Sequence, residues 1–415
     1  MDIKTYTDAL CARANHAAPI LAAAKAEVRR AAILRGAELL IEKNDEILAS
    51  NALDLAAAEQ SGMQSAMLDR LRLDSARIEG IASALRTLAD LADPTGSGEV
   101  WTRPNGLVLR RVRVPLGTVG VIYEARPNVT ADIAALCIKT GNAVVLRGGK
   151  EALETNKAVA GVLRRALSDV GLPADAVCLM ERTEREGAQA LMTAKGKIDV
   201  LIPRGGKGLI RAVVDGATVP VIETGAGNCH IFIDETADIE MAISVTENAK
   251  LSRPAVCNAV ETLLVHEKIA AEFLPLFARK TGKKLTLRGC TDTRKYLPGI
   301  EEATELDYET EYDDCILAVR VVKDVTEAIR HINRYSTGHS EAIITRSLDN
   351  AARFEREINS ACVYVNASTR FSDGGEFGFG AEVGISTQKL HARGPMGPDA
   401  LTTVKYIIEG NGQIR

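Results

Sequence analysis

Apolar positions recur at helical spacing over the first hundred residues. Residues 22–47 place Val, Ala, Leu and Ile among Lys, Arg and Glu with a period of roughly 3.6 rather than 2, and residues 75–91 repeat the pattern. Proline and glycine gather between residues 94 and 98 and end it. The sequence therefore predicts that residues 5–95 are largely helical.

Residues 99–115 predict a β-hairpin. Asn105-Gly106 is a strong hairpin signal, because both central residues of a type I′ turn need positive φ. The second arm mixes apolar residues with arginines in partial alternation. A solitary hairpin is marginally stable in water. We therefore expect it to pair with a further strand, for which another subunit is one source.

Between residues 117 and 222, strand and helix patterns alternate. The expected strands are 118–123, 143–147, 177–180, 198–202 and 219–222, and the expected helices are 129–140, 151–169, 184–194 and 206–214. Such alternation predicts a parallel sheet with right-handed crossovers. Ligands bind such sheets beyond the carboxyl ends of the strands.

A second α/β segment follows residue 228, and a glycine-rich loop spans 374–384. The expected strands are 259–266, 315–322, 342–345, 361–366 and 401–408, and the expected helices are 267–282, 325–335 and 348–358. A chain of 415 residues is too long for a single core, so two or three domains are expected.

Charge and composition narrow the class of protein. The net charge of −4 gives no global attraction to nucleic acid or to an anionic membrane, so any anion site must be local. No apolar stretch has the length of a transmembrane helix, and the first residues lack a signal peptide's apolar region. The eight cysteines form no CxxC pair, and the six histidines show no metal-ligand spacing. A cytoplasmic, metal-free protein is expected.

Two of the predicted strands end in the same tetrad, Arg-Gly-Gly-Lys, at residues 147–150 and 204–207. A strand that stops there and leads into a helix presents bare amides, a helix N-terminus and two cations, which suit a phosphate. A plain tight turn is the alternative. No GxGxxG run is present, and no Ser or Thr follows either Gly-Gly-Lys, which argues against a Walker A loop.

Cys257 differs from the other cysteines because it lies on a connection between a helical pattern and a strand pattern. Loops on rigid scaffolds commonly carry reactive groups. A nucleophilic thiol needs thiolate character, which nearby cations or helix N-terminal amides favour. No histidine partner is evident, so a Cys-His dyad is unsupported. From context alone, one more buried cysteine stays the alternative.

Two further strand exits carry polar side chains. Asn128 could donate to a developing oxyanion, or it could cap the helix after Pro127. Glu223 ends an apolar run, where it could act as a general base or close a turn.

In order and spacing, these positions resemble the aldehyde dehydrogenase superfamily. Where its hydrolytic members show Pro-Trp-Asn and Glu-Leu-Gly-Gly, this chain has Arg-Pro-Asn at 126–128 and Glu-Thr-Gly-Ala at 223–226. The runs 114–130, 322–343 and 378–387 are similar to γ-glutamyl phosphate reductases, also called glutamate-5-semialdehyde dehydrogenases. The resemblance covers nearly the whole chain.

The resemblance implies an aldehyde-dehydrogenase-like α/β fold. A Rossmann-type cofactor domain would comprise 1–98 and 117–225, an α/β catalytic domain 226–390, and a small β oligomerisation arm 99–116 and 395–415. It also implies NADPH-dependent reduction of L-glutamyl 5-phosphate to glutamate 5-semialdehyde, the second step of proline synthesis. A homo-oligomer, dimer or tetramer, and functional coupling to glutamate 5-kinase are expected, with no nucleic acid or membrane partner.

The resemblance also assigns roles to residues. Cys257 is the nucleophile and Asn128 the oxyanion donor. A general base at Glu223 is not expected, because water must be kept from the thioester. Three arginines are candidates for the substrate carboxylate, with no choice among them: Arg126, Arg253 and Arg370. The residues assigned to the cofactor are Arg147 and Lys150 at the adenosine ribose, Gly205 and Gly206 under the pyrophosphate, Glu223 and Gly225.

Two other classes of function compete with this one. A phosphotransferase that binds ATP at the two tetrads would need a carboxylate for Mg²⁺ near a phosphate loop, and the sequence offers no convincing one. A scaffold protein without catalysis is disfavoured because Cys257 and Asn128 are both present. NADPH oxidation, measured against ADP formation, separates the three classes.

Overall fold

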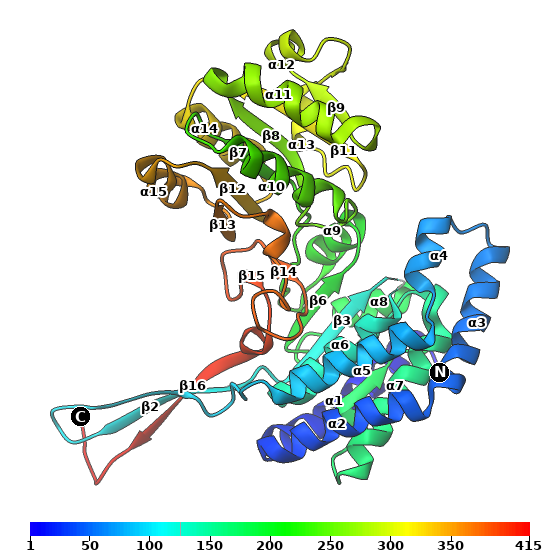
Figure 1. Ribbon diagram of the computed structural model, residues 1–415. Helices are drawn as coiled ribbons and strands as arrows, with labels where there is room; N and C mark the ends of the chain where they lie inside the picture. The colour runs from blue at the N-terminus through cyan, green and yellow to red at the C-terminus, as the bar shows by residue number, and fades with distance from the viewer. Residues whose placement is uncertain (125) are drawn as a thin grey trace. The chain divides into compact units, whose positions relative to one another are not determined.

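The computed structural model describes residues 1–124 and 126–415 (Figure 1). Clustering of contacts gives two compact units. The first comprises 1–224, 378–384 and 396–415, and the second comprises 225–377 and 385–395. Each unit combines helices with a parallel sheet, which confirms the predicted α/β class.

The predicted helical region forms the start of the first unit, as expected. The cap residues Asp2 and Asp74 accept hydrogen bonds from backbone N–H groups in the first turns of α1 and α5. Helix α2 packs against α5 and against α7. The helices are α1 (Ile3–Ala23), α2 (Ala26–Glu42), α3 (Asn44–Gln60), α4 (Ser65–Leu71) and α5 (Ser75–Asp90).

A four-stranded parallel sheet follows, in the order β5-β4-β3-β6. Leu10 and Cys11 of α1 belong to the same buried cluster as Ile122, Val145 and Cys178 of the sheet. The strands are β3 (Thr118–Tyr123), β4 (Ala143–Arg147), β5 (Val177–Leu179) and β6 (Val200–Arg204). The helices are α6 (Pro127–Thr140), η1 (Lys150–Ala152), α7 (Leu153–Asp169), η2 (Ala174–Ala176), α8 (Arg185–Met192) and α9 (Lys207–Gly216).

The order of this sheet brings the two Arg-Gly-Gly-Lys tetrads to one edge. β4 and β6 both pair with β3, in a register that sets Arg147 beside Ile122 and Arg204 beside Tyr123. Two strand spacings separate the tetrads, a distance of roughly 10 Å. The tetrads therefore share the carboxyl edge of the sheet, where ligands of such folds bind.

The predicted strand at 219–222 is wrong. Within the described residues, this segment makes a single bridge, between Val221 and Leu201. Pro220 has no N–H to donate, and the N–H of Val219 donates to the Met192 carbonyl instead. The next strand is β7 (Cys229–Ile233), which the sequence analysis missed because its short apolar run begins with Cys-His after a glycine-rich turn.

The hairpin and the C-terminal tail form one antiparallel sheet, in the order β1-β2-β16 (Figure 1). β16 pairs with β2 along all eight of its residues, so the further strand comes from the same chain. Apolar side chains stay exposed on this sheet, namely Val100, Trp101, Val404, Tyr406 and Ile408. The strands are β1 (Gly98–Thr102), β2 (Val108–Pro115) and β16 (Thr402–Glu409), and η5 (Pro398–Leu401) precedes β16.

The hairpin turn is not type I′. Gly106 has a φ of 87°, whereas Asn105 is not among the described residues with positive φ. The N–H of Gly106 donates to the Arg103 carbonyl, and the N–H of Arg103 donates to the Leu107 carbonyl. The loop is therefore longer than two residues. Pro104 favours the second position of an ordinary turn, which explains why only the glycine turns left-handed.

The second unit is built on a seven-stranded parallel sheet, in the order β10-β9-β11-β8-β7-β12-β13. Leu263 of β8 packs with Phe273 of α11, and the next residue, Leu264, packs with Phe354 of α15. Successive side chains of a strand point to opposite faces, so helices cover both. The strands are β7, β8 (Val260–His266), β9 (Thr286–Gly289), β10 (Glu301–Glu302), β11 (Ile316–Val322), β12 (Ser340–Ile344) and β13 (Cys362–Val365).

The remaining elements of the second unit confirm the helices predicted at 267–282, 325–335 and 348–358. The helices are α10 (Ile239–Leu251), α11 (Glu267–Thr281), η3 (Gly282–Lys284), α12 (Thr291–Tyr296), α13 (Glu305–Glu309), α14 (Val325–Tyr335), α15 (Leu348–Glu357) and η4 (Thr369–Phe371). The short strands β14 (Ile385–Ser386) and β15 (Gly394–Pro395) pair antiparallel. Among residues 1–124 and 126–415, no helix is both long and apolar enough to cross a membrane.

Candidate functional site

Cys257 lies on the connection between α10 and β8, as the sequence predicted, and is half-buried. The buried carboxamide of Asn258 holds this connection in place. Its Nδ2 donates to the carbonyls of Arg370, at 3.1 Å, and Ser372, at 2.9 Å. The Asn258 carbonyl accepts a 2.7 Å hydrogen bond from Thr369 Oγ1. The η4 turn therefore fixes the backbone directly after the thiol.

The backbone of Gly227 lies directly against that of Cys257. A Cβ atom on Gly227 would lie 1.4 Å from the Cys257 carbonyl oxygen and 2.7 Å from its Cα atom, so only glycine fits. The Gly227 N–H donates to Glu311 Oε1 at 2.8 Å, and the Cys229 thiol donates to the Cys257 carbonyl at 3.2 Å. The sequence analysis missed Gly227, because the contact joins residues thirty positions apart.

A buried ion pair ties the two ends of the Cys257 connection together. Lys250 in the last turn of α10 and Glu261 in β8 are both fully buried, with 2.5 Å between Nζ and Oε2. Burial raises the pKa of Glu261, and the Lys250 charge acts in the opposite direction. Removing one partner would leave the other buried and unpaired, a cost of roughly 3–5 kcal/mol.

Two guanidinium groups give the connection a positive potential. Arg370 Nε donates to Ser252 Oγ at 3.2 Å, and Nη1 donates to Asn258 Oδ1. Burial lowers the pKa of Arg370, and so does the neighbouring charge of Arg253, while Asp373 and Cys257 act in the opposite direction. Among the described residues, neither arginine forms an ion pair with a carboxylate within 4.0 Å. Nearby cations favour the thiolate form of a cysteine.

Most other cysteines are poorly suited to nucleophilic chemistry. Burial raises the pKa of the Cys11 and Cys178 thiols to about 11. It also raises the pKa of Cys137, Cys229 and Cys362. Such thiols stay protonated at neutral pH, which is consistent with Cys229 acting as a donor to the Cys257 carbonyl.

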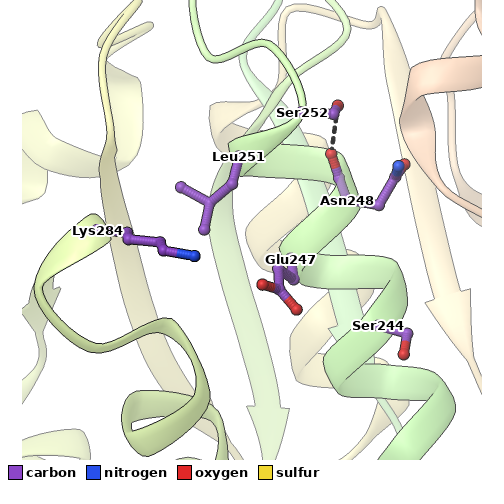
Figure 2. A pocket seen from close by; sticks show the side chains of 6 residues that line it. All are labelled: Ser244, Glu247, Asn248, Leu251, Ser252 and Lys284. Atoms are coloured by element: carbon purple, nitrogen blue, oxygen red, sulfur yellow. Dashed lines mark hydrogen bonds between the residues drawn. The ribbon is translucent and has the colours of Figure 1, made fainter.

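A surface hollow of about 470 Å³ lies beside α10, close in sequence to the Cys257 connection (Figure 2). Figure 2 shows Leu251 and Lys284 on one side and Ser252 next to Asn248, whose carbonyl accepts its hydroxyl at 2.6 Å. None of the predicted site residues lines this hollow, so we assign it no part in the site.

Asn128 lies in the first unit, as the second residue of α6. The N-cap residue of α6 is Arg126, so the capping alternative for Asn128 is wrong. Asn128 Nδ2 donates to Asp132 Oδ2 at 3.0 Å, one turn further along. A carboxamide has a second N–H, which is available to a ligand. Burial raises the pKa of Asp132 to about 6, against the Asn128 hydrogen bond and the Arg204 charge.

In the first tetrad, the Arg147 side chain is held by hydrogen bonds, whereas the Lys150 side chain is exposed. Arg147 Nη1 and Nη2 donate to the carbonyls of Gly148 and Thr183 at 3.1 and 3.0 Å, and burial lowers the pKa of Arg147. Lys150 opens η1 and is exposed, with no ion pair to any described residue. Its ammonium group is therefore available to an anion.

The second tetrad turns around a carboxylate that the sequence analysis missed. Glu124 Oε2 accepts a 3.0 Å hydrogen bond from the Gly206 N–H, and a Cβ on Gly205 would lie 2.6 Å from Glu124 Cδ. An anionic oxygen thus lies where a phosphate was expected, before the N-terminus of α9. The Gly206 N–H is thus engaged by Glu124 in this structure, and the phosphate expected at the turn stays a prediction.

The other predicted cofactor residues follow the 219–222 segment. Glu223 is half-buried, and Thr224 Oγ1 fixes the chain by donating to the Pro203 carbonyl at 2.8 Å. The Gly225 N–H donates to the Ile385 carbonyl at 2.9 Å. The structure places Asn128, Arg147, Lys150, Gly205, Gly206 and Glu223 in the first unit, and Gly225 and Cys257 in the second. The described side chains bring no three His, Cys, Asp or Glu residues together to hold a metal ion.

Comparison with known proteins identifies relatives of the whole chain. The model of the aldehyde dehydrogenase family matches residues 4–303 and 308–404. A γ-glutamyl phosphate reductase of Moorella thermoacetica is 56% identical over 405 residues, 97% of each chain. The crystal structure of γ-glutamyl phosphate reductase from Thermotoga maritima matches with a TM-score of 0.97 and 47% identity, covering 100% of both chains. An engineered glycolyl-CoA reductase with bound NADP+ matches with a TM-score of 0.69 and 18% identity, over 97% of this chain and 96% of the other.

Replacing Gly227 by alanine tests the close approach to Cys257. We expect Gly227→Ala to displace the Cys257 backbone and, by changing the surroundings of the thiol, to slow alkylation of Cys257 by iodoacetamide. Gly80→Ala is the matched control, because nothing lies within 4 Å of its new Cβ. Mass spectrometry measures the alkylation, and an unchanged rate in a folded Gly227→Ala protein would contradict the positioning role.

Proposed function

The chain belongs to the aldehyde dehydrogenase family, and we propose that it reduces L-glutamyl 5-phosphate to L-glutamate 5-semialdehyde with NADPH, releasing phosphate. This reaction is the second step of proline biosynthesis. The observation that carries the proposal is the match to the Thermotoga maritima γ-glutamyl phosphate reductase over the full length of both chains. The 56% identity to the Moorella thermoacetica enzyme supports the same substrate.

In the proposed first step, the Cys257 thiolate attacks the C5 carbonyl carbon of the acyl phosphate. A carbon–sulfur bond forms, the bond from carbon to the phosphate oxygen breaks, and phosphate leaves with the electron pair. The product is a thioester on Cys257. An acyl phosphate is already activated, so the step needs no strong general acid. The charges of Arg253 and Arg370 support the thiolate.

The oxyanion of each step needs fixed N–H donors. We assign this role to the Cys257 backbone amide and to Asn128, whose carboxamide Asp132 orients. When bound, NADPH supplies the hydride that reduces the thioester. The collapsing thiohemiacetal releases the aldehyde and returns the thiolate. Glu223 has no role as a base, because activating water would hydrolyse the thioester.

The nicotinamide cofactor fits the carboxyl edge of the first unit's sheet. Membership of the family supports a nicotinamide cofactor, and the glycolyl-CoA reductase of the same fold has bound NADP+. In the proposal, Arg147 and Lys150 hold the adenosine ribose and its 2′-phosphate, which selects NADPH. Gly205 and Gly206 receive the pyrophosphate once Glu124 releases the Gly206 amide. Glu223 and Gly225 complete the cofactor residues.

The proposal extends to location and partners. An acyl phosphate is an activated compound that water hydrolyses. A cytoplasmic enzyme coupled to glutamate 5-kinase would receive it before hydrolysis. Exposed apolar side chains on the β1-β2-β16 sheet support a homo-oligomer in which this sheet meets another subunit.

Replacing the nucleophile tests the reaction. We expect Cys257→Ala to lose more than about 10³-fold in turnover while the fold and NADPH binding persist. Formation of NADPH from glutamate 5-semialdehyde, phosphate and NADP+ measures this, and Cys315→Ala is the matched control at another half-buried cysteine. Full turnover by Cys257→Ala would rule out the thioester.

Reversing the charge at Lys150 tests the choice of cofactor. Lys150→Glu replaces an attraction to the 2′-phosphate with a repulsion, so NADPH should weaken by on the order of 2 kcal/mol, or tens-fold, relative to NADH. Lys4→Glu makes the same charge change at an exposed side chain of α1 and should leave the ratio of NADPH to NADH affinity unaltered. Steady-state kinetics with both cofactors measure the ratio. An unchanged ratio in Lys150→Glu would mean that the phosphate is held elsewhere.

Deleting the tail tests the assembly. Removing residues 401–415 removes the eight β16 residues that pair with β2. The remaining hairpin should be only marginally stable, so the protein should shift towards monomer. Removing only 410–415 leaves β16 intact and is the matched control. Light scattering gives the mass, and equal masses for the two truncated proteins would argue against the arm.

A further inference from the structure

We infer that Arg370 binds an oxyanion of the substrate, its carboxylate or its phosphate, beside the Cys257 connection. This inference rests on the proposed function, because the acyl phosphate supplies both anions. It selects one arginine from the three that the sequence left open. Four observations support it. Arg370 is hydrogen-bonded to the Cys257 connection, and some of its N–H donors are unused. It forms no ion pair with a described carboxylate, and its charge interacts with that of Cys257.

Arg370 is held at the nucleophile by two hydrogen bonds. Its Nε and Nη1 donate to Ser252 and to Asn258, which lie on the same connection as Cys257. The Asn258 carboxamide in turn donates to the Arg370 carbonyl. The guanidinium is therefore oriented before any ligand arrives, which lowers the entropy cost of binding.

These two bonds leave three of the five guanidinium N–H donors for a ligand. A guanidinium presents its donors in a planar fork that matches a carboxylate or a phosphate. Nε and Nη1 each donate one hydrogen bond, to Ser252 and to Asn258, so both N–H groups of Nη2 and one of Nη1 remain for a substrate oxygen.

Some half-buried arginines in this chain have carboxylate partners, whereas Arg147 donates to backbone carbonyls instead. The half-buried Arg164 meets Asp175 at 3.0 Å, and the half-buried Arg288 meets Asp307 at 2.8 Å. Arg370 is also half-buried, yet no described carboxylate lies within ion-pair distance of it. A partly buried charge without a partner is costly. A substrate anion would supply that partner.

The charge of Arg370 acts at the reaction centre. The charge of Arg253 lowers the pKa of Arg370 and that of Cys257 raises it, so both groups lie close enough to act on this guanidinium. An anion bound between the two arginines would offset their mutual repulsion. Arg253 is exposed and its side chain makes no hydrogen bond to any residue that the structure describes, so we assign the defined contact to Arg370 and not to Arg253.

Kinetics in the direction of semialdehyde oxidation test the inference, because this direction uses the two anions as separate substrates. We compare Arg370→Gln and Arg370→Lys with the unaltered enzyme, varying phosphate and glutamate 5-semialdehyde independently. We expect one KM to rise by about 10- to 100-fold. A rise for phosphate identifies the leaving group as the ligand, and a rise for the semialdehyde identifies the carboxylate. Unchanged KM values with a lower kcat would overturn the inference and would mean that Arg370 only holds the Cys257 connection in place.

A second measurement needs no turnover. Inorganic phosphate or L-glutamate should slow alkylation of Cys257 by iodoacetamide in the unaltered enzyme and lose this effect in Arg370→Gln. Arg356→Gln, an exposed arginine on α15, is the matched control and should keep the protection. Equal protection in Arg370→Gln would contradict the inference. Failure of the unaltered enzyme to form NADPH would instead contradict the proposed function, and circular dichroism verifies that each variant is folded.

Discussion

The Cys257 connection depends on the buried ion pair between Lys250 and Glu261. Each charge is excluded from water and is compensated by the other. If the end of α10 and the start of β8 separated, one charge would be left buried without a partner or would become exposed. The residues between them form a closed loop of fixed span. Within it, Asn258 can bond to η4, and the Cys257 carbonyl can meet Gly227 and Cys229. A flexible connection would average these contacts away.

In both units, a parallel sheet covered by helices brings residues that are distant in the sequence to one edge. Helices cover both faces of each parallel sheet, so strands such as β3 and β8 are buried along their whole length, and the strands of a sheet all end at one edge. A polar side chain inside a strand then needs a buried partner, as Glu261 in β8 has in Lys250, whereas polar side chains at the strand ends can reach a ligand. In the first unit these ends carry Arg147, Arg204 and, after β3, Asn128. The sheet supplies stability, and the short segments beyond it supply the chemistry.

Most of this fold could be predicted from local patterns. The strands β3, β4, β8 and β11 are rich in valine, isoleucine and leucine, and each lies where its apolar pattern indicated. The segment 219–222 has the same composition, but Pro220 and the competing bond from Val219 limit it to one bridge. The hairpin turn shows a similar failure, since Pro104 changed the turn that the Asn-Gly pair alone would form.

The candidate site was less predictable because its contacts are non-local. Asp132 lies four residues after Asn128, a helical spacing that the sequence displays. By contrast, the bonds from Asn258 to Arg370 and Ser372 span more than a hundred residues. Nothing near Gly227 or Glu124 in the sequence indicates that one faces the Cys257 carbonyl and the other the Gly206 amide. Only the folded chain supplies these partners.

The Glu124 carboxylate at the Gly206 amide has a consequence for selectivity. Because it is tethered to the chain, this carboxylate competes at a high effective concentration, which no dilution can reduce. A simple anion such as chloride or free phosphate offers the turn one contact and must displace a competitor that is always present. A large ligand that binds along the whole sheet edge gains several contacts for the same displacement. From this competition we expect the turn to favour ligands with several contacts along the sheet edge over small ions that offer only the right charge.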